Sequence, residues 1–394
     1  MRILRSIHTL NPAAGGPIES VTRSSVVLSR LGHEVEIISL DAPGDPWLRQ
    51  TPLKVHPLGP GRGSYGYSPR FLPWIREHRC DFDVVLVQGL WQYVSFAVWR
   101  ALHGTETPYF VFPHGMLDPW FKRTYPLKHL KKLLYWPWAE YRVLRDAAAV
   151  LFTSEEERRL ARESFSLYQC NEKVVNYGTE APPINLTVAR EEFLSRFPQL
   201  RGKRLLLFLG RLHTKKGCDL LIPAFLASHR SGHFDQSLHL VMGGPCANDA
   251  YLQHLRGLAG WPQGGEQGEM PITFTGMLDG QLKWGAFAAA EAFILPSHQE
   301  NFGIAVAESL ACGTPVLISN KVNIWREIID DGAGLAEEDN AEGISRLIER
   351  WLMMPEGERK SMREKARACF ERRFHIERAV ESLVQVLRGS VPGR

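Results

Sequence analysis

Two acidic side chains stand eight positions apart in the stretch HQENFGIAVAESLACGTPVL, residues 298–317. The apolar run before this stretch predicts a buried strand, and the small apolar residues after Gly303 predict a helix that ends at Gly313. Glu300 then lies in the connecting loop, and Glu308 lies inside the helix. A carboxylate among alanine, valine and leucine side chains is costly to bury without a partner. We therefore expect both acids to bind hydroxyl groups of one ligand, with a plain salt bridge as the alternative for Glu308.

Backbone groups at the start of this helix form a second candidate feature. The first amide N–H groups of a helix have no acceptor within the helix, so they can bind an anion or a hydroxyl group. We expect such an edge at four consecutive residues: Asn301, Phe302, Gly303 and Ile304.

Cationic side chains follow an earlier strand in the stretch FLGRLHTKKG, residues 208–217. The strand is predicted to end at Gly210, so Arg211 and Lys216 lie in a loop and Gly217 opens the next helix. A guanidinium and an ammonium beside a helix N-terminus suit a diphosphate. The alternative is a basic turn that is merely exposed to solvent.

Two loops in the first half of the chain complete the candidate residues. Gly15 and Gly16, in NPAAGGPIES, lie between a strand and a helix, where glycine lets the backbone approach a ligand closely. This loop lacks the G-x-G-x-x-G pattern of dinucleotide-binding proteins. His114 follows another strand in FVFPHGMLDPW, although a lone histidine is more often structural.

All these positions follow short, continuously apolar runs, which are typical of parallel strands covered on both faces. Helical spacing between the runs predicts βαβ units and doubly wound sheets, whose ligands bind beyond the carboxyl ends of the strands. The predicted strands are 3–8, 34–40, 83–88, 109–113, 149–154, 204–210, 238–244, 272–276, 292–297 and 315–319.

The strand pattern occurs twice, and a Gly- and Pro-containing stretch at 174–187 separates the two sets. We predict two α/β domains, one over residues 1–180 and one over residues 181–374. The amphipathic segment at about 375–390 is predicted to be a helix that packs back on the first domain.

Composition excludes several classes of protein. The hydrophobic fraction of 44% fits a globular chain, and a net charge of only +4 over 394 residues does not fit a nucleic-acid polycation. The six cysteines form no CxxC pair, which argues against a zinc site or a disulfide scaffold and fits a reducing cytosol. We see no signal peptide and no apolar run of the roughly 20 residues that span a bilayer.

The stretch from Glu300 to Glu308, together with GR-x4-KG at 210–217, resembles the retaining glycosyltransferases of family 4 along essentially the whole chain. The resemblance implies the GT-B fold, in which two Rossmann-like domains face a central cleft. It also implies that the first acid of this E-x7-E motif contacts the donor sugar and the second contacts the nucleotide ribose. Arg211 and Lys216 match the residues that hold the diphosphate.

The same resemblance implies which part of the ligand each of the other loops lies near. Gly276 and Met277, in FTGMLDG, match a loop whose backbone lies near the nucleobase. The loop of Gly15 and Gly16 matches one near the donor phosphates and the acceptor, and His114 matches a residue that contacts the donor sugar. Gln88 stands where the family often has a histidine, and we assign it no role.

The activity implied by the resemblance is retaining transfer of a sugar from a nucleotide diphosphate sugar to a glycan or lipid-linked sugar acceptor, as in bacterial polysaccharide synthesis. The predicted catalytic residues are His114, Arg211, Lys216 and Glu300. Because the two cations can stabilise the leaving diphosphate, we expect no metal ion and no other cofactor. The alternatives are a sugar-nucleotide epimerase of the same architecture, a nicotinamide dehydrogenase, which the missing fingerprint disfavours, and a non-catalytic nucleotide-sugar-binding protein.

Residues 121–145 carry seven Lys and Arg, one Glu and six aromatic side chains. Basic residues interleaved with Trp and Tyr suit an anionic membrane surface, where a lipid-linked acceptor would be found. The alternative is a solvated helix whose aromatic residues pack into the first domain. Nucleic acid is not an expected partner, because nothing elsewhere extends the basic patch. We expect a cytoplasmic protein that is peripheral at the inner face of the cell membrane.

Overall fold

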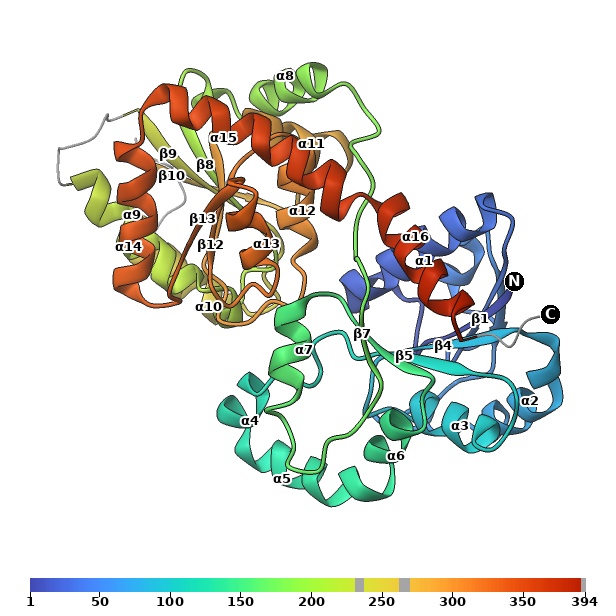
Figure 1. Ribbon diagram of the computed structural model, residues 1–394. Helices are drawn as coiled ribbons and strands as arrows, with labels where there is room; N and C mark the ends of the chain where they lie inside the picture. Colours follow the sequence, from blue (N-terminus) through green and yellow to red (C-terminus); the bar gives the residue numbers. More distant parts are fainter. Residues whose placement is uncertain (231–236, 262–269, 391–394) are drawn as a thin grey trace. The chain divides into compact units, whose positions relative to one another are not determined.

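The chain folds into two compact α/β units. The computed structural model describes residues 1–230, 237–261 and 270–390. One unit comprises Met1–Gly178 and Ile376–Arg394, and the other comprises Thr179–His375 (Figure 1). The first crossing between them falls inside the stretch 174–187 that the sequence marks as a linker.

The first unit contains a parallel sheet with the strand order β3-β2-β1-β4-β5-β6-β7 in the described part of the chain. The strands are β1 (Arg2–Ser6), β2 (Glu34–Ser39), β3 (Lys54–Pro57), β4 (Val84–Gln88), β5 (Tyr109–Phe112), β6 (Ala149–Phe152) and β7 (Glu172–Val174). The α-helices are α1 (Gly16–Arg30), α2 (Phe71–His78), α3 (Tyr93–Leu102), α4 (Trp120–Thr124), α5 (Pro126–Tyr135), α6 (Glu140–Arg145), α7 (Glu155–Ala161) and α16 (Ile376–Arg388).

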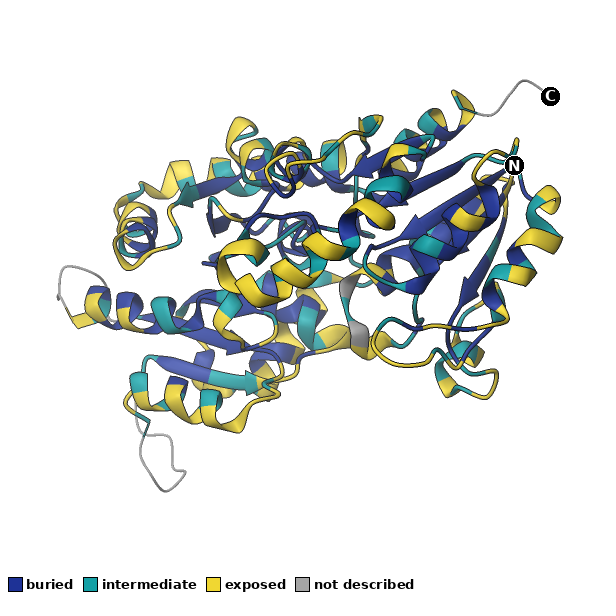
Figure 2. Ribbon diagram, turned by 90° about the horizontal axis from the view of Figure 1, so that it is seen from below, coloured by how far each residue is buried: buried dark blue, intermediate teal, exposed yellow. Residues whose placement is uncertain are grey.

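Alternating residues of the central strands build two apolar cores, one on each face of this sheet. In β4, Val85 and Val87 belong to the core formed with α3 and α6, whereas Val84 and Leu86 belong to the core formed with α16. Both faces are apolar because helices cover both, as the continuous apolar runs predicted. Figure 2 shows the strands as buried ribbons and the outer helix faces as exposed.

The second unit repeats this architecture, with the strand order β10-β9-β8-β11-β12-β13 in its described part. The strands are β8 (Arg204–Leu209), β9 (Leu238–Gly243), β10 (Ile272–Gly276), β11 (Ala292–Leu295), β12 (Val316–Ser319) and β13 (Gly334–Glu337). The α-helices are α8 (Leu186–Arg196), α9 (Cys218–Arg230), α10 (Asp249–Leu258), α11 (Gly280–Ala289), α12 (Ile304–Ala311), α13 (Trp325–Asp330), α14 (Ala341–Met353) and α15 (Glu356–Cys369), and a π-helical turn follows at Phe370–Phe374.

All ten predicted strands are present, within two residues at each end. The sequence analysis missed β3, β7 and β13, which lie at sheet edges. Each of these strands has only three or four residues and contains a charged side chain, because an edge strand is only partly covered. The apolar signal that identifies a central strand is therefore weak in them.

The C-terminal helix α16 packs on the first unit. Val380, Leu383 and Leu387 join the core on one face of the first sheet, and α16 contacts α1. Among the residues described, no helix has both the length and the hydropathy that crossing a bilayer requires.

Candidate functional site

The strand order reverses between β8 and β11 in the second unit, and the candidate donor-binding residues lie at this point. β9 and β10 continue on one side of β8, whereas β12 and β13 continue beyond β11. The loops that follow β8 and β11 therefore leave the sheet in opposite directions, which opens a crevice at the carboxyl ends of the strands. Arg211 and Lys216 follow β8, and Glu300 follows β11.

The Lys216 ammonium forms an ion pair with the Glu300 carboxylate, although the two residues are 84 positions apart. Their side chains are only 17% and 19% exposed. Close packing of the two loops brings the residues together: Gly217 has a φ of 67°, and a Cβ atom there would lie 2.1 Å from the carbonyl oxygen of Pro296. Only glycine fits this position.

Burial of Lys216, with Lys215 and Arg211 nearby, lowers the pKa of its ammonium to about 7. A desolvated ammonium keeps its proton best when an anion neutralises it, as the Glu300 carboxylate does here. A bound diphosphate would serve the same purpose. The site is thus electrostatically suited to an anionic ligand.

Arg211 is exposed and makes no hydrogen bond or ion pair with any residue that the structure describes. Its position close to Lys216 follows from the effect of its charge on the pKa of that lysine. A guanidinium without an internal partner has all its donors available for a ligand.

The loop after β11 is held by its backbone. The Glu300 N–H donates to the carbonyl of Lys321 at 2.9 Å, and the Asn323 N–H donates to the carbonyl of Glu300 at 3.0 Å. Gly303, with a φ of 75°, precedes α12, and no side chain caps this helix start. Ile304, the first residue of α12, therefore opens a helix turn whose amides lack a side-chain acceptor.

The other predicted residues of this loop have partners inside the unit. The Asn301 side chain accepts from Asn323 at 3.4 Å. The Phe302 ring is 4% exposed and contacts Phe374 edge-on, so its side chain belongs to the interior of the unit.

Glu308 is 4% exposed and forms an ion pair with Lys283 of α11 at 2.7 Å. The salt bridge that the sequence left as the alternative is therefore present. The sequence analysis missed Lys283, which carries no motif and lies on a different helix. The Lys283 ammonium also lies 4.5 Å from the centre of the Trp284 ring, which fixes it above the buried acid.

The loop predicted to lie near a nucleobase follows β10. Gly276 has a φ of 71° and its carbonyl accepts from the Gly244 N–H at 2.7 Å, while Met277 is 66% exposed. Gly244 itself was missed: a Cβ atom there would lie 1.9 Å from the carbonyl oxygen of Gly210. The Gly-Gly pair at 243–244 was the signal that could have identified it.

In the first unit, the strand order reverses between β1 and β4, and the predicted residues again follow these and neighbouring strands. Gly15, with a φ of 104°, and Gly16, the first residue of α1, lie in the loop after β1. His114 follows β5. Gln88 ends β4, between these strands, and its amide oxygen lies 2.8 Å from His114 Nε2.

His114 is neutral at physiological pH, because burial and the nearby Arg5 charge lower the pKa of its imidazole to about 4. Its ring stacks on Phe112 and meets Tyr177 edge-on. With a φ of 50°, it is one of the two non-glycine residues with positive φ in the described chain. Such strain persists where the surrounding structure fixes a residue, and it is common at functional sites.

Two positioning residues for His114 were not predicted. Gln88 binds its imidazole, and Glu157 holds the next residue through a bond from the Gly115 N–H to Oε1 at 2.6 Å. The other oxygen of Glu157 accepts from the N–H and the hydroxyl of Thr153. Ser154 caps α7 by accepting from the Glu157 N–H at 3.1 Å, so the S-x-x-E pattern at 154–157 was an available signal.

Comparisons with known proteins agree with this two-unit arrangement. Residues 15–178 match the family profile described as "Glycosyl transferase 4-like domain", and residues 190–368 match "Glycosyl transferases group 1". A curated relative, the GDP-mannose-dependent alpha-(1-6)-phosphatidylinositol dimannoside mannosyltransferase of Mycobacterium tuberculosis, is 26% identical over 98% of this chain and 96% of its own.

Two solved structures share the fold. Sucrose-phosphate synthase from Thermosynechococcus elongatus has a TM-score of 0.75 at 20% identity and covers 98% of both chains. Anabaena HepE, solved in complex with UDP and glucose, has a TM-score of 0.74 at 15% identity over 99% of this chain and 100% of its own. The two parallel sheets and these likenesses confirm the predicted GT-B fold class.

Proposed function

Since the chain belongs to the glycosyltransferases, with a glycosyl transferase 4-like domain followed by a group 1 domain, we propose that it is a retaining, metal-independent enzyme. It carries out nucleotide-sugar-dependent glycosyl transfer. The proposed acceptor is a glycan or a lipid-linked sugar, as in bacterial polysaccharide synthesis, and the proposed location is the cytoplasm, at the inner face of the membrane.

One observation carries the proposal for the donor site. The Lys216 ammonium and the Glu300 carboxylate meet at the β8–β11 reversal, and beside them lies Arg211, which has no partner among the described residues. Two cations suit a diphosphate, and a carboxylate suits sugar hydroxyls. Donor binding then exchanges one ion pair for another: Lys216 turns to the phosphate, and Glu300 is released to the sugar.

The proposed chemistry follows from the charge on the leaving group. As the bond between the sugar and the phosphate breaks, the diphosphate gains negative charge, which Arg211 and Lys216 stabilise without a metal ion. The acceptor hydroxyl attacks from the same face and gives its proton to the leaving phosphate oxygen, so the anomeric configuration is retained. His114 is neutral and offers a hydrogen bond to the donor sugar.

The relatives narrow the donors to be tested. The mycobacterial relative is named as dependent on GDP-mannose, and HepE was solved with UDP. We propose a nucleoside diphosphate sugar as the donor and leave the base to experiment. Gly276 and the exposed Met277 are the proposed neighbours of that base, and Glu308 is the proposed contact to the ribose, shared with Lys283. The Gly15–Gly16 loop is the proposed neighbour of the donor phosphates and the acceptor.

The test of this function is a thermal-shift panel with UDP, GDP, ADP, CDP and NAD, each in EDTA and then in magnesium. A ligand at about 100 times its dissociation constant adds roughly 2.7 kcal/mol of apparent stability. We expect one nucleoside diphosphate to raise the melting temperature selectively, and equally with and without magnesium. A shift with NAD alone, or with no diphosphate, would contradict the proposal.

We further propose that α5 rests on an anionic membrane. Its apolar side faces solvent: Leu127, Leu134 and the nearby Trp138 are 79%, 73% and 69% exposed, and Leu130 is also exposed. Large exposed apolar side chains on one helix mark an interaction surface. The net charge of +6 over 121–145 favours anionic lipids as the partner.

Replacing Leu127 and Leu134 together with glutamate is expected to weaken binding to vesicles of phosphatidylglycerol and phosphatidylcholine. Inserting one leucine contributes about 1.5–3 kcal/mol, so the double variant should lose at least about tenfold in flotation affinity. Leu31→Glu is the control, because Leu31 is 54% exposed at the end of α1, away from this helix. Equal flotation of the double variant and the wild type would rule out this contact surface.

A further inference from the structure

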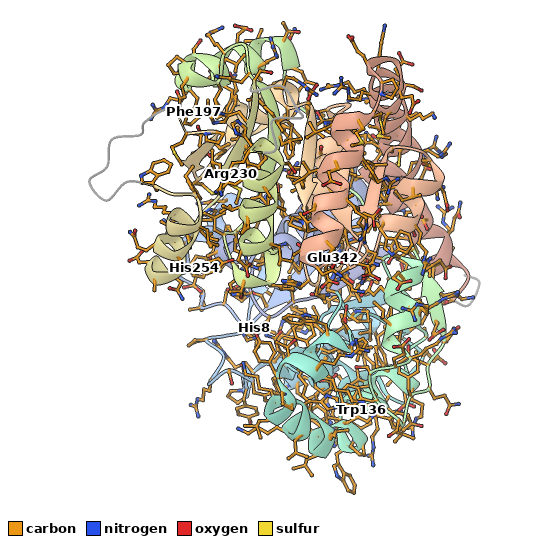
Figure 3. All side chains as sticks on the ribbon, turned by 90° about the vertical axis from the view of Figure 1, so that its left-hand side faces the viewer. His8, Trp136, Phe197, Arg230, His254 and Glu342 are labelled. Carbon is orange, nitrogen blue, oxygen red and sulfur yellow. The ribbon has the colours of Figure 1, made fainter. Side chains whose placement is uncertain are left out.

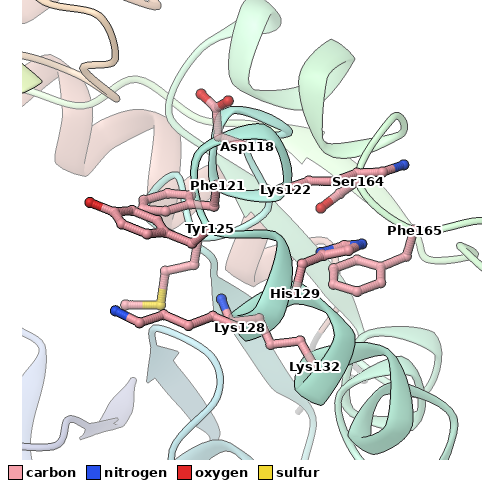
Figure 4. A pocket seen from close by; sticks show the side chains of 10 residues that line it. Asp118, Phe121, Lys122, Tyr125, Lys128, His129, Lys132, Ser164 and Phe165 are labelled. Atoms are coloured by element: carbon pink, nitrogen blue, oxygen red, sulfur yellow. The ribbon is translucent and has the colours of Figure 1, made fainter.

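A cavity of about 60 Å³ lies in the first unit beside α4 and α5, and its charged lining is mostly cationic (Figure 4). Lys122 of α4 and Lys128 and Lys132 of α5 line it, together with His129. Asp118 is the one acid among the lining residues, and it accepts a hydrogen bond from the Trp120 N–H at 2.8 Å. The lining therefore carries an excess of positive charge.

The three lysines form no ion pair with a carboxylate among the residues that the structure describes. The Lys128 ammonium lies 4.7 Å from the centre of the Tyr125 ring. The Lys132 ammonium lies 4.3 Å from the centre of the Trp91 ring and 5.7 Å from that of Phe121. Aromatic faces hold these ammonium groups in place without neutralising them, so each cation remains available to an anion.

Lys132 is the most buried of the three lysines. Desolvation, with Lys128 nearby, lowers the pKa of its ammonium to about 8, and the charge of Glu140 on α6 acts in the opposite direction. Glu140 is itself buried, accepts from the Trp91 N–H at 2.7 Å, and has its pKa raised to about 7 by burial. No carboxylate therefore neutralises Lys132 fully, and an anion in the cavity would stabilise its charged form.

Aromatic side chains line part of the cavity, and further aromatic side chains pack behind them. Phe165 stacks on Trp136, which is labelled in Figure 3, with ring centres 4.1 Å apart, and on His129 at 4.9 Å. Trp91 has a φ of 69°, a strained conformation that its contacts with Glu140 and Met116 hold. Preformed, mostly apolar walls with a few converging polar groups are typical of a small-molecule site.

The cavity adjoins the loop that carries His114. Met116, two residues further along, lines the cavity, and its carbonyl accepts from the Trp91 indole at 3.4 Å. A ligand bound in the cavity therefore lies next to the loop of His114.

We propose that this cavity binds a phosphate ester on the acceptor, with the oxygen atoms held by Lys122, Lys128 and Lys132 and the attached sugar or polyol against the aromatic wall. The inference rests on the proposed function, since it concerns the acceptor of the same transfer. It names the acceptor as a phosphorylated sugar or a phospholipid head group, which share this chemistry.

The experiment uses the full chain and glycerol 3-phosphate as the probe, with binding measured by calorimetry at low salt. A Lys216→Met background weakens the proposed diphosphate site, so that the probe reports mainly on the cavity. The double variant Lys128→Gln/Lys132→Gln should bind the probe at least about tenfold more weakly. Lys131→Gln, on the same helix but outside the cavity lining, should bind like its parent.

Two further measurements distinguish a lipid phosphate from a free phosphate ester, and failure of the cavity proposal from failure of the proposed donor site. Flotation on phosphatidylcholine vesicles with and without phosphatidic acid detects a lipid phosphate; selective loss in the double variant, with either probe, supports the proposal. Equal losses in Lys131→Gln, or no saturable binding of either probe by the parent, would overturn it. Nucleoside diphosphate shifts, measured on the lysine variants with Lys216 intact, should stay as in the wild type, so a failure of the donor site is recognised separately.

The affinity of the cavity for glycerol 3-phosphate should also depend on pH. Lys132 is charged below its pKa of about 8, so affinity should fall as the pH rises from about 7 to about 9. In the double variant this dependence should disappear. A structural role for Lys132 would not produce such a profile.

Discussion

Replacing Lys216 with methionine is expected to lower kcat for sugar transfer by about 100- to 1,000-fold, the usual effect of removing one preorganised group that stabilises developing charge. Methionine keeps much of the length of the side chain and removes only the cation. The loss should be larger in kcat than in donor affinity, because the charge on the diphosphate increases as the bond to the sugar breaks. Initial rates and nucleotide affinities of the variant and the wild type measure the two effects.

The matched control is Lys203→Met. Lys203 is exposed and directly precedes β8. It therefore lies at the amino end of this strand, whereas Lys216 follows the carboxyl end. The loss of Lys203 should change neither rate nor affinity. A wild-type rate for Lys216→Met would show that the ion pair with Glu300 is purely structural.

A second substitution protects this test against misfolding. Lys216→Met leaves the Glu300 carboxylate without its partner, and removing one partner of a buried ion pair destabilises a fold. Arg211 has no hydrogen-bond or ion-pair partner in the described structure, so Arg211→Met breaks no such bond. Arg211→Met should therefore keep the wild-type melting temperature while it lowers the rate of transfer.

The placement of Arg211, Lys216 and Glu300 could be predicted because it depends on local information. Each residue follows an apolar run, and parallel strands bring their carboxyl ends to one edge of a sheet. The helix at 304–311 was predictable for the same reason, since small apolar residues precede Gly313, which adopts a φ of 71° just past the helix end.

Partners between distant segments could not be predicted. Glu308 pairs with Lys283, and His114 binds Gln88, but nothing local in the sequence says which helix or strand end each will face. Tertiary packing decides these pairs. The residue type of Gln88, which departs from that of similar proteins at this position, gives no sign that it binds His114.

The orientation of α5 was unpredictable for the same reason. The composition of residues 121–145 shows that basic and aromatic side chains are frequent, but it does not show which of them face solvent and which face the interior. Pro126 begins α5 and Pro137 lies in a short 3-10 turn after it, so the segment is broken into several short helices and not one. Within α5, Lys128 and Lys132 line the cavity while Leu127 and Leu134 face solvent, the reverse of the usual arrangement for a helix on a soluble domain.

Replacing Glu300 with glutamine is expected to abolish most sugar transfer while nucleoside diphosphate binding persists. The carboxylate accepts charge-assisted hydrogen bonds from sugar hydroxyls, whereas an amide accepts weaker ones, so a loss of at least about 100-fold in kcat is expected. Glu291→Gln is the matched control. Glu291 directly precedes β11 and pairs with Arg204, so it is an ion-paired acid at the opposite end of the strand that leads to Glu300.

The same variant should make diphosphate binding dependent on pH. With Glu300 in place, burial together with the charges of Lys215 and Arg211 holds the pKa of the Lys216 ammonium at about 7, and loss of the carboxylate partner should lower that pKa further. An ammonium is charged below its pKa, so the affinity of Glu300→Gln for the diphosphate should already fall at a pH below about 7. In the wild type, Glu300 keeps the ammonium protonated to higher pH, so the fall should occur at higher pH.

Titrations of the diphosphate that raises the melting temperature, repeated between about pH 5 and pH 9 on both proteins, measure this difference. Two results would be decisive. Unchanged transfer by Glu300→Gln would remove Glu300 from the donor-sugar site. If transfer is lost but diphosphate affinity depends on pH in the same way in both proteins, Glu300 contacts the sugar but does not stabilise the charged form of Lys216. Only lost transfer together with a profile shifted to lower pH supports an ion pair that separates when the donor binds, because that mechanism alone requires one carboxylate to serve both the ammonium and the sugar.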